Sequence, residues 1–181
     1  DGDVVILDQG DTQLGRGESL QDTIKVLSRY VDLIMYRGSN EDKLYEMRAF
    51  SSVPIINGLT DNSHPCQILA DIMTLEENFK SLEKLKICWI GDGNNVCNSW
   101  IHSCSHFKYN LNICCPEGCF PNENIIKKNN KKKNIKTFSD PKLAIRESDV
   151  VITDTWVSMG MKDDPKRIKK FKGFQINEDL I

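Results

Sequence analysis

Residues 85–95 read LKICWIGDGNN, and this stretch decides the fold. Its first half is a mostly apolar run, which is typical of a buried strand, and the glycines and asparagines after it are turn residues. A helix pattern follows over residues 95–106. A strand, a turn and a helix in this order form the unit from which parallel α/β sheets are built.

The same alternation extends from this stretch in both directions. Towards the C-terminus we expect strands at residues 111–114, 135–138 and 150–153, with a weak helix after Asn122 and a short helix after Asp140. Towards the N-terminus we expect strands at residues 4–7, 33–36 and 53–56, the last ended by Asn57 and Gly58, and helices after Ser19 and over residues 41–50. Ser19 and Asp22 resemble a capping box, which marks the start of the first helix.

A longer amphipathic helix is predicted to begin near His64 and Pro65, because proline suits the first helical turn and apolar residues follow at helical spacing. This helix lies between two runs of strands. The expected fold class is therefore α/β, with two Rossmann-like parallel-sheet domains, residues 1–82 and 83–181, joined by the long helix. We expect the first domain to be incomplete and the chain to be a piece trimmed at both ends, since it starts without Met and both ends fall close to structural segments.

Composition excludes several classes of protein. The chain has 181 residues, of which 39% are hydrophobic and 28% are charged, so a folded domain with a core is expected. No apolar run approaches the roughly 18 residues that cross a bilayer. A net charge of −2 argues against a nucleic-acid partner, and the lysines between residues 127 and 136 lack aromatic neighbours that could stack on bases.

Seven cysteines are present, an odd number, and several lie inside apolar runs. We expect reduced thiols in a reducing intracellular compartment, with Cys88 and Cys114 buried on strands. The spacing of the cysteines relative to His102 and His106 does not match the common zinc modules, so no structural metal is expected.

Polar residues follow the predicted strands of the first half. Arg37 comes directly after the strand at 33–36, and His64 and Gln67 lie three residues apart on one face of the long helix. Helix starts and carboxyl ends of strands face the usual ligand crevice of an open α/β sheet. His64 and Gln67 could therefore grip a small polar group together, or they could only cap the helix.

Two further turns in the second half are candidates for ligand binding. The turn at 91–95 resembles a nucleotide-binding turn, but the third glycine of that fingerprint is replaced by Val96, so a dinucleotide is not expected. Asn95 could bind another ligand there. Residues 154–160 read DTWVSMG after the last strand, and Asp154 could bind an ammonium group or cap a turn. Such groups on two domains predict a ligand cleft.

In chain order, these segments resemble the ornithine carbamoyltransferases of the aspartate/ornithine carbamoyltransferase family. The resemblance is carried by residues 13–19, 22–23, 26–30, 37, 53–61, 64–67, 91–95 and 154–160. Each motif alone is modest, but all of them in order are specific. The resemblance implies two α/β domains with the active site between them, a homotrimer, and no metal or organic cofactor. It implies a cytoplasmic enzyme of arginine metabolism, with the mitochondrial matrix as the alternative.

The resemblance also assigns roles to individual residues. Three would bind carbamoyl phosphate: Arg37, His64 and Gln67. Four would bind L-ornithine: Asn95, Asp154, Ser158 and Met159. The δ-amine of ornithine would attack the carbamoyl carbon, giving L-citrulline and phosphate. Arg37 and His64 would be catalytic, because they can donate to the oxygen on which negative charge develops.

The chain departs from the family at both ends, and other functions stay open. The Ser-Thr-Arg-Thr segment that binds phosphate in the family and its late His-Cys-Leu-Pro segment are both absent from this sequence. A non-catalytic ligand-binding or assembly module of the same fold is one alternative. Aspartate carbamoyltransferase is another, disfavoured by residues 154–160. A nucleotide-binding oxidoreductase is disfavoured because the third glycine of the nucleotide-binding fingerprint is missing from this sequence.

We expect the 181-residue chain on its own not to be a competent carbamoyltransferase. Orientation of two substrates supplies up to roughly 7–11 kcal/mol of the barrier reduction in such a reaction, and a partial site loses much of it. A citrulline-formation assay on the purified chain beside a longer protein that contains both missing segments is the test. Turnover within about tenfold of the longer protein, a difference of about 1.4 kcal/mol, would contradict this expectation.

Overall fold

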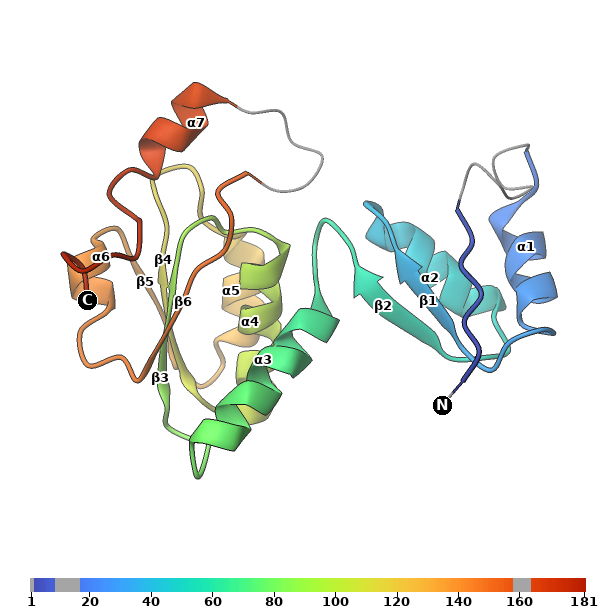
Figure 1. Ribbon diagram of the computed structural model, residues 1–181, viewed down its shortest axis with the longest axis horizontal. Helices are drawn as coiled ribbons and strands as arrows, with labels where there is room; N and C mark the ends of the chain where they lie inside the picture. The colour runs from blue at the N-terminus through green and yellow to red at the C-terminus, as the bar shows by residue number, and fades with distance from the viewer. Residues whose placement is uncertain (1, 9–16, 158–163) are drawn as a thin grey trace. The chain divides into compact units, whose positions relative to one another are not determined.

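The computed structural model describes residues 2–8, 17–157 and 164–181, and the chain divides into two compact units, Asp1–Asp61 and Asn62–Ile181 (Figure 1). The first unit contains α1 (Leu20–Leu27), β1 (Ile34–Arg37), α2 (Glu41–Phe50) and β2 (Ile55–Leu59). The second contains α3 (Pro65–Asn78), β3 (Lys86–Ile90), α4 (Asn95–Phe107), β4 (Asn110–Cys114), α5 (Glu123–Asn129), β5 (Ile135–Phe138), α6 (Pro141–Ala144), β6 (Val150–Ile152) and α7 (Pro165–Lys170). None of the described helices is long and apolar enough to cross a membrane.

In the first unit, β1 and β2 pair in parallel and α1 contacts α2. The predicted helix start at Ser19 is confirmed, because its Oγ accepts a hydrogen bond of 3.1 Å from the backbone N–H of Asp22. Asn40 caps α2 in the same way, through a bond of 2.8 Å from the N–H of Asp42. Local side-chain chemistry thus fixes where both helices begin.

The strand expected at residues 4–7 is wrong. Val4, Val5, Ile6 and Leu7 are 51–85% exposed and belong to no strand. An apolar, β-branched run has a strand propensity, but that propensity is realised only against a neighbouring strand and a buried face. In the described part of the chain this run has neither.

The expected end of β2 at Asn57 and Gly58 is also wrong, because the strand continues to Leu59. Tyr36 lies opposite Asn57 but Arg37 lies opposite Leu59, so Gly58 is an extra residue in β2. A Cβ atom at Gly58 would lie 3.1 Å from the backbone oxygen of Tyr36, which explains why glycine occupies the irregularity. The Asn-Gly pair marks a bulge, and bulges alter the direction of nearby side chains such as Arg37.

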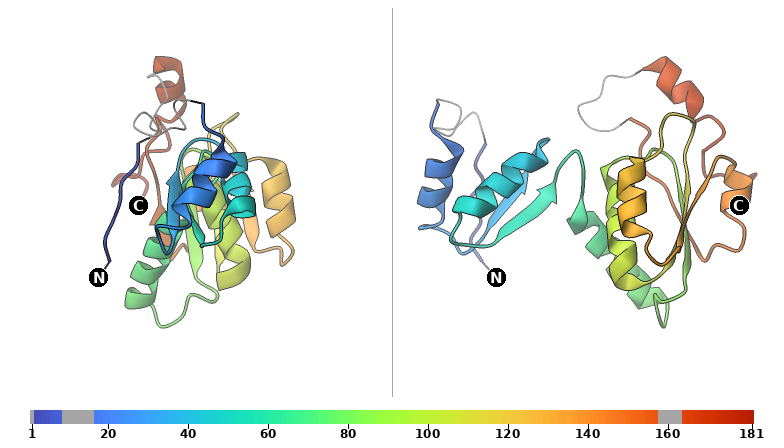
Figure 2. Two further views of the ribbon diagram at one scale, coloured as in Figure 1. Left: turned by 90° about the vertical axis from the view of Figure 1, so that its right-hand side faces the viewer. Right: turned by 180° about the vertical axis from the view of Figure 1, so that it is seen from behind.

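The second unit is a parallel sheet in the order β5-β4-β3-β6. Figures 1 and 2 show α4 and α5 on one face of this sheet and α6 on the other. The predicted α/β class with parallel sheets is confirmed, and the strands and helices expected between residues 64 and 153 all form, with ends within about two residues. The sequence analysis missed α7.

Burial on both faces explains why β3 is apolar throughout. Ile87 and Trp89 point into the core that α3 and α4 cover, whereas Cys88 and Ile90 point into the smaller core beside α6. All four are fully buried. Alternating residues face opposite sides of a strand, so a strand covered on both sides reads as a continuous apolar run.

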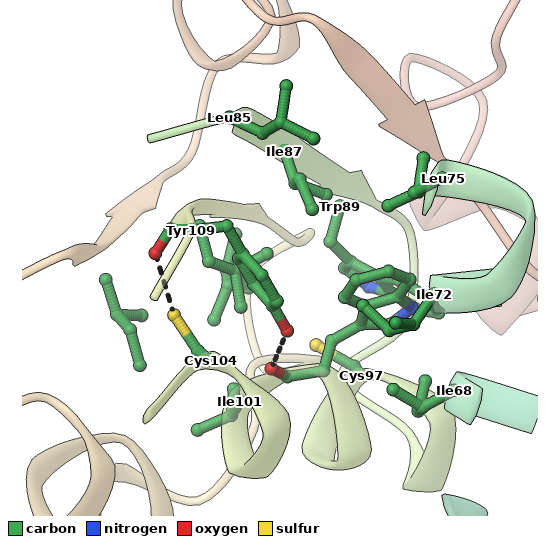
Figure 3. Packing of buried hydrophobic residues seen from close by; sticks show 14 of the residues in the cluster. Ile68, Ile72, Leu75, Leu85, Ile87, Trp89, Cys97, Ile101, Cys104 and Tyr109 are labelled. Carbon is green, nitrogen blue, oxygen red and sulfur yellow. Dashed lines mark hydrogen bonds between the residues drawn. The ribbon is translucent and has the colours of Figure 1, made fainter. Parts of the chain in front are cut away.

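The larger core is closed by α3 and α4, as Figure 3 shows. Ile68, Ile72 and Leu75 form the buried stripe of α3. Trp100 of α4 lies edge-on to Tyr109, with ring centroids 5.5 Å apart, and the Tyr109 hydroxyl donates to the Trp100 carbonyl over 2.7 Å. This packing fixes the position of α3 within the second unit.

All seven cysteines are free, and all except Cys66 are buried. The predicted burial of Cys88 and Cys114 is confirmed. Burial raises the pKa of the Cys88, Cys104 and Cys114 thiols to about 12, so these thiols stay protonated at neutral pH. They act as small apolar side chains of the core.

The strand order reverses at β3. Along the chain, β4 and β5 add on one side of β3, and β6 then returns to its other side. Ligand crevices of open α/β sheets lie beside such a reversal, outside the carboxyl ends of the strands. The loops after β3 and β6 are therefore the expected place for a site.

Gly93, in the loop after β3, allows a close backbone approach. Its N–H donates to the Cys119 carbonyl over 2.8 Å, and a Cβ atom would lie 2.3 Å from the Pro121 nitrogen. We expect Gly93→Ala to lower the free energy of unfolding by about 1–3 kcal/mol, the range for overpacked sites. The measurement is chemical denaturation of the second unit's transition.

Gly173→Ala is the matched control, because a Cβ atom there meets nothing within 4 Å. We expect its free energy of unfolding to stay within about 1 kcal/mol of wild type. Equal stability of the two variants would contradict the close approach at Gly93.

Candidate functional site

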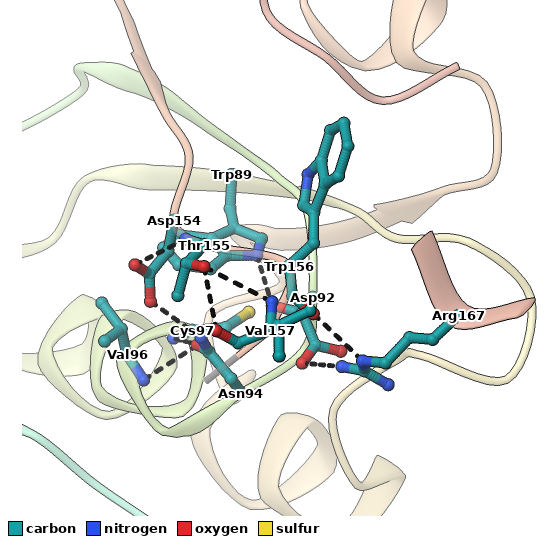
Figure 4. A network of polar contacts seen from close by, with 10 residues as sticks. All are labelled: Trp89, Asp92, Asn94, Val96, Cys97, Asp154, Thr155, Trp156, Val157 and Arg167. Atoms are coloured by element: carbon teal, nitrogen blue, oxygen red, sulfur yellow. Dashed lines mark hydrogen bonds and ion pairs between the residues drawn. The ribbon is translucent and has the colours of Figure 1, made fainter. Parts of the chain in front are cut away.

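Asn94 joins the loops that follow β3 and β6 (Figure 4). Its Oδ1 accepts from the N–H groups of Val96 and Cys97, over 3.0 and 3.1 Å, and so caps the start of α4. Its Nδ2 donates to Oδ2 of Asp154 over 2.8 Å. One side chain thus satisfies a helix N-terminus and fixes a carboxylate that is 60 residues later in the chain.

Asp154 is held from two sides and remains partly exposed. Its Oδ1 accepts from the N–H of Thr155 over 2.7 Å, and Oδ2 accepts from Asn94. A carboxylate has about four lone-pair positions, so further acceptor capacity remains on both oxygens. The group is suited to binding a cation in a defined orientation.

A second carboxylate, Asp92, lies in the loop after β3 and is nearly buried. Its Oδ2 forms an ion pair with Nη2 of Arg167 on α7. Arg167 Nε also donates to the Trp156 carbonyl over 3.0 Å, and the guanidinium lies over the Phe171 ring at 5.4 Å. Burial raises the pKa of the Asp92 carboxyl, and Arg167 counteracts that rise. Arg167 therefore ties α7 to the loops after both β3 and β6.

The start of α3 is held by α4. The backbone N–H of His64 donates to Oγ of Ser99 over 2.7 Å, and that hydroxyl donates to the Asn95 carbonyl over 2.8 Å. The His64 side chain makes no capping bond to the helix. The sequence left two roles open for His64, binding a ligand or capping the helix. The imidazole does not cap the helix.

Gln67 and Asp71 continue the polar face of α3 that begins at His64. Gln67 Nε2 donates to Oδ1 of Asp71 over 2.9 Å. Burial raises the pKa of the Asp71 carboxyl; the Gln67 bond and His64 act against that rise, and Asp154 adds to it. His64, Gln67, Asp71 and Asp154 thus lie close enough to interact within the second unit.

The other predicted site residues fall elsewhere. Arg37 is exposed at the end of β1, in the first unit. Asn95 is partly buried at the first position of α4, beside the Asn94 cap. Ser158 and Met159 lie outside the described residues. Among the residues that the structure describes, no three His, Cys, Asp or Glu side chains are grouped to hold a metal ion.

Sequence reasoning missed Asp71, Asp92 and Arg167, although signals for two of them were present. Asp164 and Pro165 begin α7 as an N-cap and a first helical residue, the same pair that predicted the helix after Asp140. Asp71 follows His64 by seven residues, which is two helical turns. The partner of Asp92 is 75 residues away in the chain, and no local pattern identifies it.

Comparison with known proteins supports one family over nearly the whole chain. Residues 83–181 match the family model described as "Aspartate/ornithine carbamoyltransferase, Asp/Orn binding domain". Residues 1–77 match the model described as "Aspartate/ornithine carbamoyltransferase, carbamoyl-P binding domain".

Relatives and solved structures agree with these matches. The chain is 44% identical to an ornithine carbamoyltransferase of Nitrobacter winogradskyi over 99% of its own length and 59% of the relative's. It is also 44% identical to an ornithine carbamoyltransferase of Methanobrevibacter smithii, over 99% of its own length and 62% of the relative's. The structure of the Pyrococcus furiosus ornithine carbamoyltransferase is similar, with 40% identity and a TM-score of 0.87 over 94% of this chain and 56% of that one. The chain thus spans about three fifths of the length of the curated relatives it matches.

We expect Arg167→Met to destabilise the second unit by about 3 kcal/mol at neutral pH, because it leaves the Asp92 carboxylate nearly buried without its counter-ion. The loss should shrink as the pH falls. In the variant the pKa of Asp92 is raised further, and a protonated carboxyl needs no counter-ion. Chemical denaturation at neutral and acidic pH measures both effects.

Lys166→Met is the matched control, since Lys166 is exposed on the same helix and should have little effect. Adding Asp92→Asn to Arg167→Met should recover part of the loss. A loss that is independent of pH and unchanged by Asp92→Asn would contradict the ion-pair explanation.

Proposed function

The chain belongs to the aspartate/ornithine carbamoyltransferase family, and we propose that the protein containing it transfers the carbamoyl group of carbamoyl phosphate to the δ-amine of L-ornithine. The products are L-citrulline and phosphate. The names of the relatives support ornithine as the acceptor. No metal or organic cofactor is needed, because the nucleophile is an amine and the leaving group is already a phosphate.

One observation carries the proposal: the Asp154 carboxylate is fixed by Asn94 and Thr155 beside the polar face of α3. An amino acid presents an α-ammonium group that such a carboxylate can bind. With the α-ammonium bound at Asp154, the δ-amine is the nitrogen left to react. We assign Asn95, Ser158 and Met159 to the same ornithine site.

We assign carbamoyl phosphate to Arg37, His64 and Gln67. As the δ-amine attacks the carbamoyl carbon, the C–N bond forms and negative charge develops on the carbamoyl oxygen. Arg37 and His64 are suitable donors to that oxygen, and removal of one such donor typically costs about 2.7–4 kcal/mol of the barrier reduction. The Gln67 side-chain carbonyl accepts from the carbamoyl NH2. The C–O bond to phosphate then breaks, and the leaving phosphate takes up the proton that the amine loses.

The proposal extends to the organisation of the protein. We propose that residues 1–82 belong to a carbamoyl-phosphate domain and residues 83–181 to an ornithine domain, and that the protein is a homotrimer in the cytoplasm. The descriptions of the two matched family models support this division of roles.

Asp154→Asn tests the proposal in the longer protein that contains this chain. The loss of a charged partner for the α-ammonium should lower kcat/KM for ornithine by roughly 10–150-fold, as expected for about 1.5–3 kcal/mol. The KM for carbamoyl phosphate should not change. Steady-state citrulline formation, with each substrate varied in turn, gives both values.

Asp179→Asn is the matched control, because Asp179 is exposed and should not affect either substrate. An Asp154→Asn enzyme with unchanged kcat/KM for ornithine would contradict the assignment of Asp154 to the ornithine site. A wild-type protein that forms no citrulline would contradict the proposed function as a whole.

A further inference from the structure

We propose that Asp71 is a positioning residue of the carbamoyl-phosphate site, which holds the Gln67 side-chain amide in the orientation that directs its carbonyl oxygen to the carbamoyl NH2. Asp71 belongs to none of the motifs that identified the chain. The inference rests on the proposed function, because the role of Gln67 does.

The contact between the two side chains fixes the direction of the amide. Gln67 Nε2 lies 2.9 Å from Oδ1 of Asp71, one helical turn further along α3. An ionised carboxylate only accepts hydrogen bonds, so the NH2 group of Gln67 must face it. The opposite orientation would bring two acceptor oxygens together. The Gln67 carbonyl oxygen therefore points away from Asp71.

That direction matters for the recognition of a carbamoyl group. The group carries one carbonyl oxygen, which Arg37 and His64 are proposed to bind, and one NH2, which only donates. An acceptor placed opposite the NH2 distinguishes the two ends of the group, and so orients the carbon towards the attacking amine. A glutamine free to turn would also present its own NH2 group, which repels the carbamoyl NH2.

The surroundings of Asp71 indicate that its position is not explained by stability. Its carboxylate is partly buried, and the pKa of that carboxyl is raised by burial and by the charge of Asp154, and lowered by Gln67 and His64. Glutamine–aspartate pairs one turn apart add only a little to the stability of a helix. Burial and a nearby like charge oppose that gain. A partly buried carboxylate near a like charge opposes stability, and such residues are expected at functional sites.

Asp71→Asn in the longer protein tests the inference. Asparagine has the same shape, but it can accept or donate, so it no longer selects one orientation of Gln67. We expect carbamoyl phosphate to bind roughly 10-fold more weakly by titration calorimetry, and kcat/KM for carbamoyl phosphate to fall by a similar factor. The KM for ornithine should change little. Glu77→Gln removes a charge from an exposed position of the same helix and is expected to behave as wild type.

A double-mutant cycle separates positioning from a general structural effect. If Asp71 acts through Gln67, the double variant Gln67→Ala, Asp71→Asn should bind carbamoyl phosphate as weakly as Gln67→Ala alone. Additive losses, or Asp71→Asn binding that equals wild type, would overturn the inference.

The outcomes also separate this inference from the proposed function. Citrulline formation by wild type and by Asp71→Asn at equal rates overturns the inference alone. A wild-type protein that binds carbamoyl phosphate without forming citrulline overturns the proposed function, while the binding cycle still decides the role of Asp71. A protein that does not bind carbamoyl phosphate overturns both.

Discussion

The Asn94 side chain is the interaction on which the rest of the site depends. Its oxygen caps α4, and its nitrogen holds Asp154, so the same amide sets the start of a helix and the direction of a carboxylate. The strand order makes this possible: β6 returns to the side of β3, which brings the loop after β6 next to the loop after β3. A site at this reversal follows from the topology, and Asn94 supplies its geometry.

Asp92 and Asp71 are two carboxylates near this site, and different partners offset the cost of burying each of them. Asp92 has Arg167 as a direct partner, and the pair ties α7 to the loops after β3 and β6. Asp71 accepts a hydrogen bond from the Gln67 amide, His64 lowers the pKa of its carboxyl, and Asp154 raises it. The first arrangement joins elements that are far apart in the chain. The second leaves Asp71 subject to the like charge of Asp154, and a bound cation would relieve that repulsion.

Local patterns in the sequence account for most of the fold but only part of the site. Ser19, Asp140 and Pro65 mark helix starts because caps and first-turn prolines act over three or four residues. The strand expected at residues 4–7 failed because its propensity needs a neighbour that no local pattern reveals, and Asn57-Gly58 marked a bulge instead of an end. Motifs predicted site roles for His64, Gln67 and Asp154, whereas the contact of Arg167 depends on a partner 75 residues away.

Helix α3 shows why such a site needs a well-packed core beneath it. Ile68, Ile72 and Leu75 bury one stripe of the helix against the core, and the polar stripe of His64, Gln67 and Asp71 runs beside it. A shift of the buried stripe would move the polar one with it. A polar site of the kind we propose tolerates little displacement of its groups, so the apolar packing would set its accuracy. In this unit, the stability of the core and the placement of the proposed site therefore depend on the same helix.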